Sequence, residues 1–263
     1  MPRSSAPAPR TRLTAAAVVE AAVELSGAAH LLSWSIRDLA GRLGTSPSSI
    51  YHHVGGKDRL CREVAEHVVR RLPVPEPCGD WRAWFRRLLL PAGPLLMRYP
   101  GVAAWFALHG PTVPAALPIV ERGFRELRGA GFGADAVHAF ALLFNTALLT
   151  VSLGDERLRH EEDGARDHAA IVRDVEELAA ARPGLRFLPE ELLRPLAEGG
   201  ERALRARMEH YRFAVETVVE GLAAALEAGR LGAERHREAG RPGGRRPPYN
   251  GGSDNGGSVG TAP

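Results

Sequence analysis

Hydrogen-bonding side chains between positions 45 and 57 form the part of the sequence best suited to specific contacts. The run holds hydroxyl and imidazole groups and no carboxylate: Thr45, Ser46, Ser48, Ser49, Tyr51, His52 and His53, followed by Lys57, the only lysine of the chain. A solvated helix in a chain with 25% charged residues would be expected to carry Glu or Asp. Small hydroxyl residues allow a backbone to approach DNA closely, and tyrosine and histidine can reach phosphates or base edges. Each of these residues could also belong to a polar helix face that has no binding partner. That alternative accounts less well for the whole set together.

Two short helices, over 36–44 and 46–54, are predicted to position these side chains. Ser35 followed by Asp38 resembles a capping box, and Ser46 followed by Pro47 is a favourable helix start. Their apolar residues are expected to face inward: Ile36, Leu39, Ala40, Leu43, Ile50 and Val54. Helix, glycine-containing turn and helix make a helix-turn-helix, whose second helix can enter the major groove of DNA. The first turn of that helix also offers N–H groups to a phosphate.

The rest of the sequence predicts an all-α protein. Apolar residues recur at helical spacing, and no segment has a convincing strand pattern. Helices are expected at about 14–26, 36–44, 46–54, 57–71, 80–98, 101–109, 114–129, 134–153, 162–181, 189–198 and 200–228. Gly27 is expected to stop the first, and Pro91 and Pro94 to kink or split the fifth.

Composition divides the chain into four parts. We expect a disordered basic arm at 1–13, a helix-turn-helix domain at 14–72, a larger helical domain at 78–229, and a disordered tail at 230–263 rich in Gly and Pro. The boundary is placed in the Pro-rich stretch 73–77. The apolar segment 133–153 is interrupted by polar residues, which favours a buried core helix over a membrane span.

Signals for catalysis are weak. The sequence shows no phosphate loop, nucleophile elbow or metal-ligand pair. Cys61 and Cys78 have neither the number nor the spacing of a disulfide framework or zinc site, and the reducing cytoplasm is the natural compartment. The stretch His160–His168, with its acidic residues, could mimic a metal site, but its spacing and Gly164 favour a charged connection. We therefore expect no catalytic residue, cofactor or metal.

The segment Ser35–Leu60 resembles the DNA-binding domain of the TetR family of bacterial transcriptional regulators. The matching residues are Leu39-Ala40, Leu43-Gly44, Ile50-Tyr51-His52-His53-Val54 and Lys57-Asp58-Arg59-Leu60. Order and spacing agree together, and the resemblance covers about residues 12–72. The remaining two-thirds agrees with that family in length and helical character.

The resemblance implies roles for individual residues on double-stranded DNA. Tyr51 and Lys57 correspond to the family's phosphate-contacting tyrosine and lysine, and His53 to a histidine near the DNA backbone. Base-reading residues occur in the family at the positions of Arg37, Ser48, Ser49 and His52. The recognition helix has no Arg, Gln or Asn for bidentate base contacts, so specificity is expected to rest on Arg37, His52, waters and DNA shape.

A homodimer is expected, because one helix-turn-helix contacts little DNA and such proteins bind palindromic operators in pairs. The last helix offers an apolar seam of Leu204, Met208, Tyr211, Val215, Val218, Leu222 and Leu226. The segment 137–151 has Val137, Phe140, Phe144, Leu148 and Val151 on one face and further leucines on the other. The resemblance implies a dimer built as a four-helix bundle. The alternative is that both helices only fill the core of one chain.

The resemblance further implies that a small hydrophobic effector releases the protein from DNA. Candidate ligand-binding residues are Trp105, His109, His138, Phe144 and Asn145, although an aromatic residue alone is more often core. The segment 57–71 would transmit the movement between domains, and repression is the family's usual sign of regulation. Two rivals remain: a helical dimeric ligand-binding protein without DNA binding, and a helical enzyme.

Overall fold

The computed structural model describes residues 13–162 and 168–232, and within this part of the chain every regular element is a helix. The predicted all-α class is confirmed. The described residues belong to one compact unit. The basic arm expected at 1–13 and the tail expected at 230–263 lie almost entirely outside the described residues. The domain boundary at 73–77 stays a prediction, although it falls between two helices as expected.

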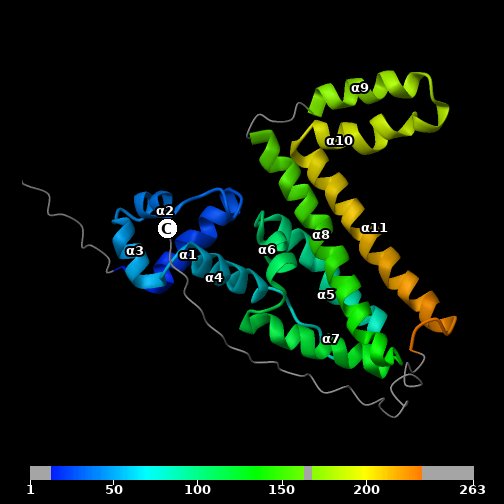
Figure 1. Ribbon diagram of the computed structural model, residues 1–263, viewed down its shortest axis with the longest axis horizontal. Coiled ribbons are helices and arrows are strands. Elements are labelled where there is room, and N and C mark those ends of the chain that lie inside the picture. The colour runs from blue at the N-terminus through cyan, green and yellow to red at the C-terminus, as the bar shows by residue number, and fades with distance from the viewer. Residues whose placement is uncertain (1–12, 163–167, 233–263) are drawn as a thin grey trace, which may run out of the picture. The chain divides into compact units, whose positions relative to one another are not determined.

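Four helices make up the N-terminal part of the molecule (Figure 1): α1 (Ala15–Ala28), α2 (Ile36–Arg42), α3 (Pro47–Val54) and α4 (Lys57–Val69). Helix α1 packs against the other three. Its central side chains Val18 and Ala22 are fully buried, as are Leu39, Ile50 and Leu60 of its partners. Helix α1 continues through Gly27 to Ala28, a little beyond the predicted end.

Seven helices follow: α5 (Trp81–Met97), α6 (Val102–His109), α7 (Leu117–Gly129), α8 (Ala136–Glu162), α9 (His168–Ala180), α10 (Arg194–Ala197) and α11 (Gly200–Glu227). Short 3₁₀ turns at Pro114–Ala116 and Gly133–Asp135 lead into α7 and α8, and a π turn at Leu188–Leu193 leads into α10. Helix α8 runs beyond its predicted end at position 153. Gly154 lies inside the helix and makes room for Arg207, because a Cβ there would lie 2.4 Å from the Arg207 Nε.

Helix α5 is continuous from Trp81 to Met97 despite Pro91 and Pro94, so the predicted split does not occur. It packs closely on Tyr211 of α11, which is almost fully buried and whose hydroxyl donates to the Leu89 carbonyl at 2.7 Å. Burial raises the pKa of Tyr211 well above its ordinary value. The ring fits because position 93 is glycine.

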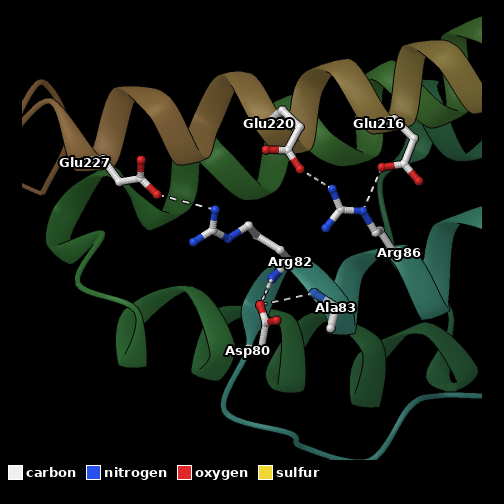
Figure 2. Close-up of polar contacts among 7 residues, drawn as sticks. All are labelled: Asp80, Arg82, Ala83, Arg86, Glu216, Glu220 and Glu227. Atoms are coloured by element: carbon white, nitrogen blue, oxygen red, sulfur yellow. Dashed lines mark hydrogen bonds and ion pairs between the residues drawn. The ribbon is translucent and has the colours of Figure 1, made fainter.

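Ion pairs at the surface fasten α5 to α11, as Figure 2 shows. The Arg86 Nε donates to Glu216 at 2.7 Å, and the same guanidinium also pairs with Glu220. One turn earlier, Arg82 lies 3.4 Å from Glu227. Partly exposed pairs of this kind contribute about 0–1 kcal/mol each, so they set the register of the two helices more than they stabilise them.

Helices α8 and α11 lie side by side (Figure 1) and carry apolar residues on two sides. The seam predicted on α11 is mostly core of the same chain, since Tyr211, Val215 and Leu222 are buried. The large apolar side chains left exposed are Val137, Leu142, Leu149 and Leu153 of α8 and Leu204, Met208 and Phe213 of α11. The predicted seam therefore divides along the helix. Its later members pack against α5 and α8, while Leu204 and Met208, near the start of α11, stay exposed.

The stretch Gly133–Arg157 is long and apolar enough to cross a membrane, with mean hydropathy 1.7 in its most apolar part, of which 33% is buried. The bent pair Val102–His109 and Pro114–Gly129 is also long and apolar enough if the two segments are taken together. Core helices of soluble proteins often have the same length and composition. Because α8 packs against α6, α7 and α11, we interpret it as a core helix, as the sequence indicates.

Replacing Gly93 by alanine is expected to lower the free energy of unfolding by about 1–3 kcal/mol through overpacking. The new Cβ would lie 2.4 Å from the Tyr211 ring, which is locked in the core. The matched control is Gly221→Ala in α11, where nothing lies within 4 Å of the Cβ. That change is expected to stabilise by about 0.4–1 kcal/mol. Urea unfolding of both variants checks the pair, and equal effects would contradict the packing described here.

Candidate DNA-binding surface and effector cavity

The turn between α2 and α3 fixes the direction in which α3 points. Gly44 has a φ of +59°, a left-handed conformation that favours glycine. The Thr45 N–H donates to the Ala40 carbonyl at 3.0 Å and closes the end of α2. At the start of α2, Ser35 and Asp38 form the predicted capping box, with the Ser35 N–H donating to Asp38 at 2.7 Å. Both ends of α2 are thus held, and α3 packs against a fixed support.

The outer face of α3 presents uncharged hydrogen-bonding groups. Ser48, Tyr51 and His52 are exposed and lie on one side of the helix, while Ile50 and Val54 are buried on the other. Ser46 is the N-cap, as predicted. Its hydroxyl accepts from the Ser49 N–H at 3.3 Å and lies 3.0 Å from the Ser49 hydroxyl. Ser46 and Ser49 therefore shape the helix start, and the three exposed residues form the contact face.

The remaining predicted DNA-binding residues border this face. Arg37 is exposed on α2. Thr45 and His53 are half-buried, and the His53 ring meets the His52 ring edge to face at 5.6 Å. Arg37 and His52 keep the exposure that base reading requires, while Thr45 and His53 lie where the helix meets its support.

Lys57 has a different environment from the one predicted for a phosphate clamp. Its Nζ donates to the carbonyls of Leu31 and Trp34, both at 2.8 Å, and lies 2.7 Å from the centre of the Trp34 ring. Burial lowers the pKa of Lys57 to about 8, and Cys61 and Asp38 partly offset this effect. The ammonium thus holds the turn between α1 and α2 in place.

A cavity of about 230 Å³ lies between α5, α6, α7 and α8. Of the described residues that line it, none is charged, and Asn145 supplies the polar side chain. The Phe140 and Phe144 rings stack 4.3 Å apart along one wall. The other lining residues are almost all small or apolar, among them Val69, Leu72, Leu88, Leu96, Phe106, Ala107 and Ile119. The site suits a small apolar molecule with one hydrogen-bonding group.

The structure brings together two of the five predicted ligand residues, Phe144 and Asn145. Trp105 and His109 stack on each other at 4.5 Å and line a separate groove beside α4, because their face of α6 is turned away from that of Phe106. His138 is exposed on α8, two turns before Asn145 and outside the lining of the cavity. Trp105, His109 and His138 therefore do not share this cavity with Phe144 and Asn145.

Helix α4 connects the contact face with the cavity. Val69 near its end and Leu72 just beyond it line the cavity. Glu66, almost fully buried, accepts from the Ala115 N–H at 3.1 Å, and Arg62 donates to the Thr112 carbonyl at 2.8 Å. These two contacts tie α4 to the segment between α6 and α7, whose residues Gly110, Pro111 and Ala116 also line the cavity.

Known proteins share this arrangement of helices. No protein-family model matches the chain. The Streptomyces coelicolor TetR family protein ActR, in complex with actinorhodin, has a similar fold, with a TM-score of 0.59 and 23% identity over 82% of this chain and 99% of that one. The HTH-type transcriptional repressor DrrR1 of Streptomyces coeruleorubidus is 25% identical over 217 residues, 81% of this chain and 78% of that protein.

An HTH-type transcriptional regulator of Saccharopolyspora erythraea is 30% identical over 175 residues, which cover 66% of this chain and 73% of that protein. The chain belongs to the TetR family. As a TetR family regulator it carries its DNA-binding helix-turn-helix in α2 and α3, as the sequence predicted.

Sequence reasoning missed several residues that hold this TetR regulator together. Glu66 joins α4 to the cavity wall, and Asp155 of α8 pairs with Arg207 of α11. Nothing in their spacing marks them, since each partner is far away in the sequence. Among the described residues no cluster of His, Cys, Asp or Glu could hold a metal. The stretch His160–His168 weighed as a metal site lies largely outside the described residues.

The pKa of Lys57 can be measured directly, because it is the only lysine. Protein labelled with ¹³C at the lysine ε position is expected to give one resonance that titrates near pH 8 when folded and near 10.5 in urea. Between these values the unfolded chain binds more protons, so this group makes the free energy of unfolding rise with pH. A folded-state midpoint near 10.5 would contradict the effect of burial on the pKa of Lys57.

Proposed function

We propose that the protein is a homodimeric repressor that binds a palindromic operator through α3 and is released by a small hydrophobic effector. The observation that carries the proposal is the exposed row of Ser48, Tyr51 and His52 on a helix whose start, end and inner face are all fixed. Such a row can contact phosphates and base edges without repelling the anionic duplex.

The contact face of α3 offers no Arg, Gln or Asn for bidentate contacts with bases, so strong base contacts are scarce. Tyr51 and the Ser48 N–H contact phosphates, and the Ser48 side chain, His52 and Arg37 read bases. Ser46, Ser49, Thr45 and His53 support them from the edge of the face. Lys57 acts as a positioning residue, because two of its three N–H donors already bind carbonyls of its own domain. DNA shape supplies part of the specificity.

Dimerisation through α8 and α11 is supported by their exposed apolar side chains. Leu149 and Leu153 of α8 and Phe213 of α11 are each more than half exposed and border a common groove. Apolar residues gathered in this way mark an interaction surface. A twofold dimer would bury them and carry two α3 helices to successive major grooves, about 34–36 Å apart.

Release by an effector is supported by the cavity and by its contact with α4. The ActR structure holds actinorhodin within the same fold. A molecule in the present cavity would press on Val69 and Leu72, and α4 would carry the displacement toward α3. The effector then favours a dimer whose α3 helices no longer match two grooves, which is a population shift. The similarity to DrrR1 supports repression as the sign of regulation.

The proposal places the protein in the cytoplasm, at the nucleoid when bound to DNA, and assigns it no enzymatic activity. The two rivals are a helical dimer that binds ligand without DNA and a helical enzyme. Turnover of a substrate unaffected by changes in α3 would favour the enzyme.

DNA binding is tested by gel shift with duplexes selected from a random pool and with DNA upstream of the protein's own gene. Tyr51→Ala is expected to weaken binding by about 1–3 kcal/mol at every salt concentration, because its uncharged hydroxyl releases no counterion from the DNA. Lys57→Met should weaken binding while leaving the slope of log affinity against log salt unchanged. A slope reduced by about one would mean that Lys57 contacts a phosphate after all. Ligand binding without retardation of any duplex would favour the DNA-free rival.

The cavity is tested by partly filling it. The probe is 2-naphthol, a neutral bicyclic molecule, whose binding is followed by calorimetry. Ala107→Phe is expected to reduce binding at least about tenfold, because the ring occupies cavity space. His138→Ala, outside the cavity, is the matched control and should bind as wild type does. Equal binding by all three proteins would show that the cavity is not the site.

A further inference from the structure

The segment after α1 packs against the turn between α5 and α6. This contact between the DNA-binding helices and the rest of the molecule does not involve α4. His30 and Leu31 follow α1, and the Leu31 N–H donates to the Pro100 carbonyl at 2.8 Å. His30 is 5% exposed and covers Gly101, the residue before α6. Gly101 has a φ of +90°, and a Cβ there would lie 2.6 Å from the His30 ring. Two independent constraints thus select glycine at this contact.

The Gly101 turn is held from behind by a buried ion pair. The Gly101 N–H donates to the Asp155 Oδ2 at 3.1 Å, and Arg207 Nη2 donates to the other carboxylate oxygen at 2.6 Å. The Asp155 side chain is 1% exposed and that of Arg207 is 10% exposed. Asp155 lies on α8 and Arg207 on α11, so the pair links the turn to both helices that carry the exposed apolar faces.

His30 adds a second link to α8. Its Nδ1 accepts from the Leu32 N–H at 3.2 Å, which leaves the Nε2 hydrogen to face the Glu156 carboxylate at 3.4 Å. The links run in sequence from α1 through His30 and Gly101 to Asp155 and Arg207. We call this set of four residues the clasp.

A buried ion pair is a poor source of net stability, because two charges must be desolvated to form it. A buried ion pair can instead fix the relative position of the elements that carry it, since few arrangements satisfy both charges and their hydrogen bonds. The clasp is such an arrangement, and it lies where the DNA-binding helices α1–α4 meet α8 and α11.

We propose that Asp155 and Arg207 are positioning residues for DNA binding, which fix the orientation of α1–α4 relative to α8 and α11. The inference rests on the proposed function, because it assumes a dimer on two half-sites. In such a dimer the clasp sets the distance between the two α3 helices, and hence the half-site spacing that the protein accepts. Breaking the clasp loosens spacing selectivity and leaves the contact face of α3 intact.

The test uses the full chain and palindromic duplexes selected by the wild-type protein, remade with the centre shortened or lengthened by one and two base pairs. Asp155→Asn removes the charge and keeps the size. It is expected to reduce the affinity ratio between the selected and altered spacings by about 2- to 30-fold. The matched control is Glu216→Gln, which breaks an ion pair of α11 outside the clasp and should leave the ratio unchanged.

A second variant and a second measurement cover the case in which Asp155→Asn does not fold. Gly101→Ala breaks the clasp without changing any charge and is expected to relax spacing in the same way. Hydrogen exchange in wild type should show the Gly101 and Leu31 amides protected. Unprotected amides in folded wild type, or unchanged spacing ratios in folded variants, would overturn the inference alone. A wild-type protein that binds no duplex would overturn the proposed function and the inference together.

Discussion

The packing of α3 onto α1 and α2 is the constraint on which the functional surface depends. Ile50 is completely buried and Val54 nearly so, and both meet the core that contains Leu39. Burying a side chain of this size is worth about 1.5–3 kcal/mol, which far exceeds what the exposed polar residues of a short helix contribute. An eight-residue helix is marginal by itself in water. Its contact face therefore exists because the inner face is buried.

Polar residues around α3 fall into two groups, those that bind other groups of the protein and those that extend into solvent. Side chains that support the helix are engaged within the domain, such as Ser46 at its N-cap and Lys57, which binds the turn between α1 and α2. Side chains on the outer face, such as Tyr51, extend into solvent. The Lys57 ammonium is occupied by two carbonyls of its own domain, although its position in the sequence suggests direct contact with DNA.

Local signals in the sequence were sufficient for the helix-turn-helix and for the all-α fold. The capping box at Ser35, the N-cap at Ser46 and the glycine at position 44 each act within a few residues, so they can be read without a structure. The residues that line the cavity could be predicted only in part. Phe144 and Asn145 line it, but Trp105, His109 and His138 do not, because the rotation and extent of each helix depend on packing with distant partners. The predicted seam of α11 divides between core and surface for the same reason, and the Asp155–Arg207 pair joins residues that no local pattern connects.

The central claim is that two copies of α3 sit in major grooves on one face of duplex DNA. Hydroxyl-radical and methylation footprinting on a selected palindrome measures this most directly. The account predicts two symmetric protected patches, one helical turn or about 34–36 Å apart, with guanine N7 shielded in the major groove of each half-site. A folded protein that leaves the duplex uniformly accessible, or protects a single unsymmetrical patch, would contradict it.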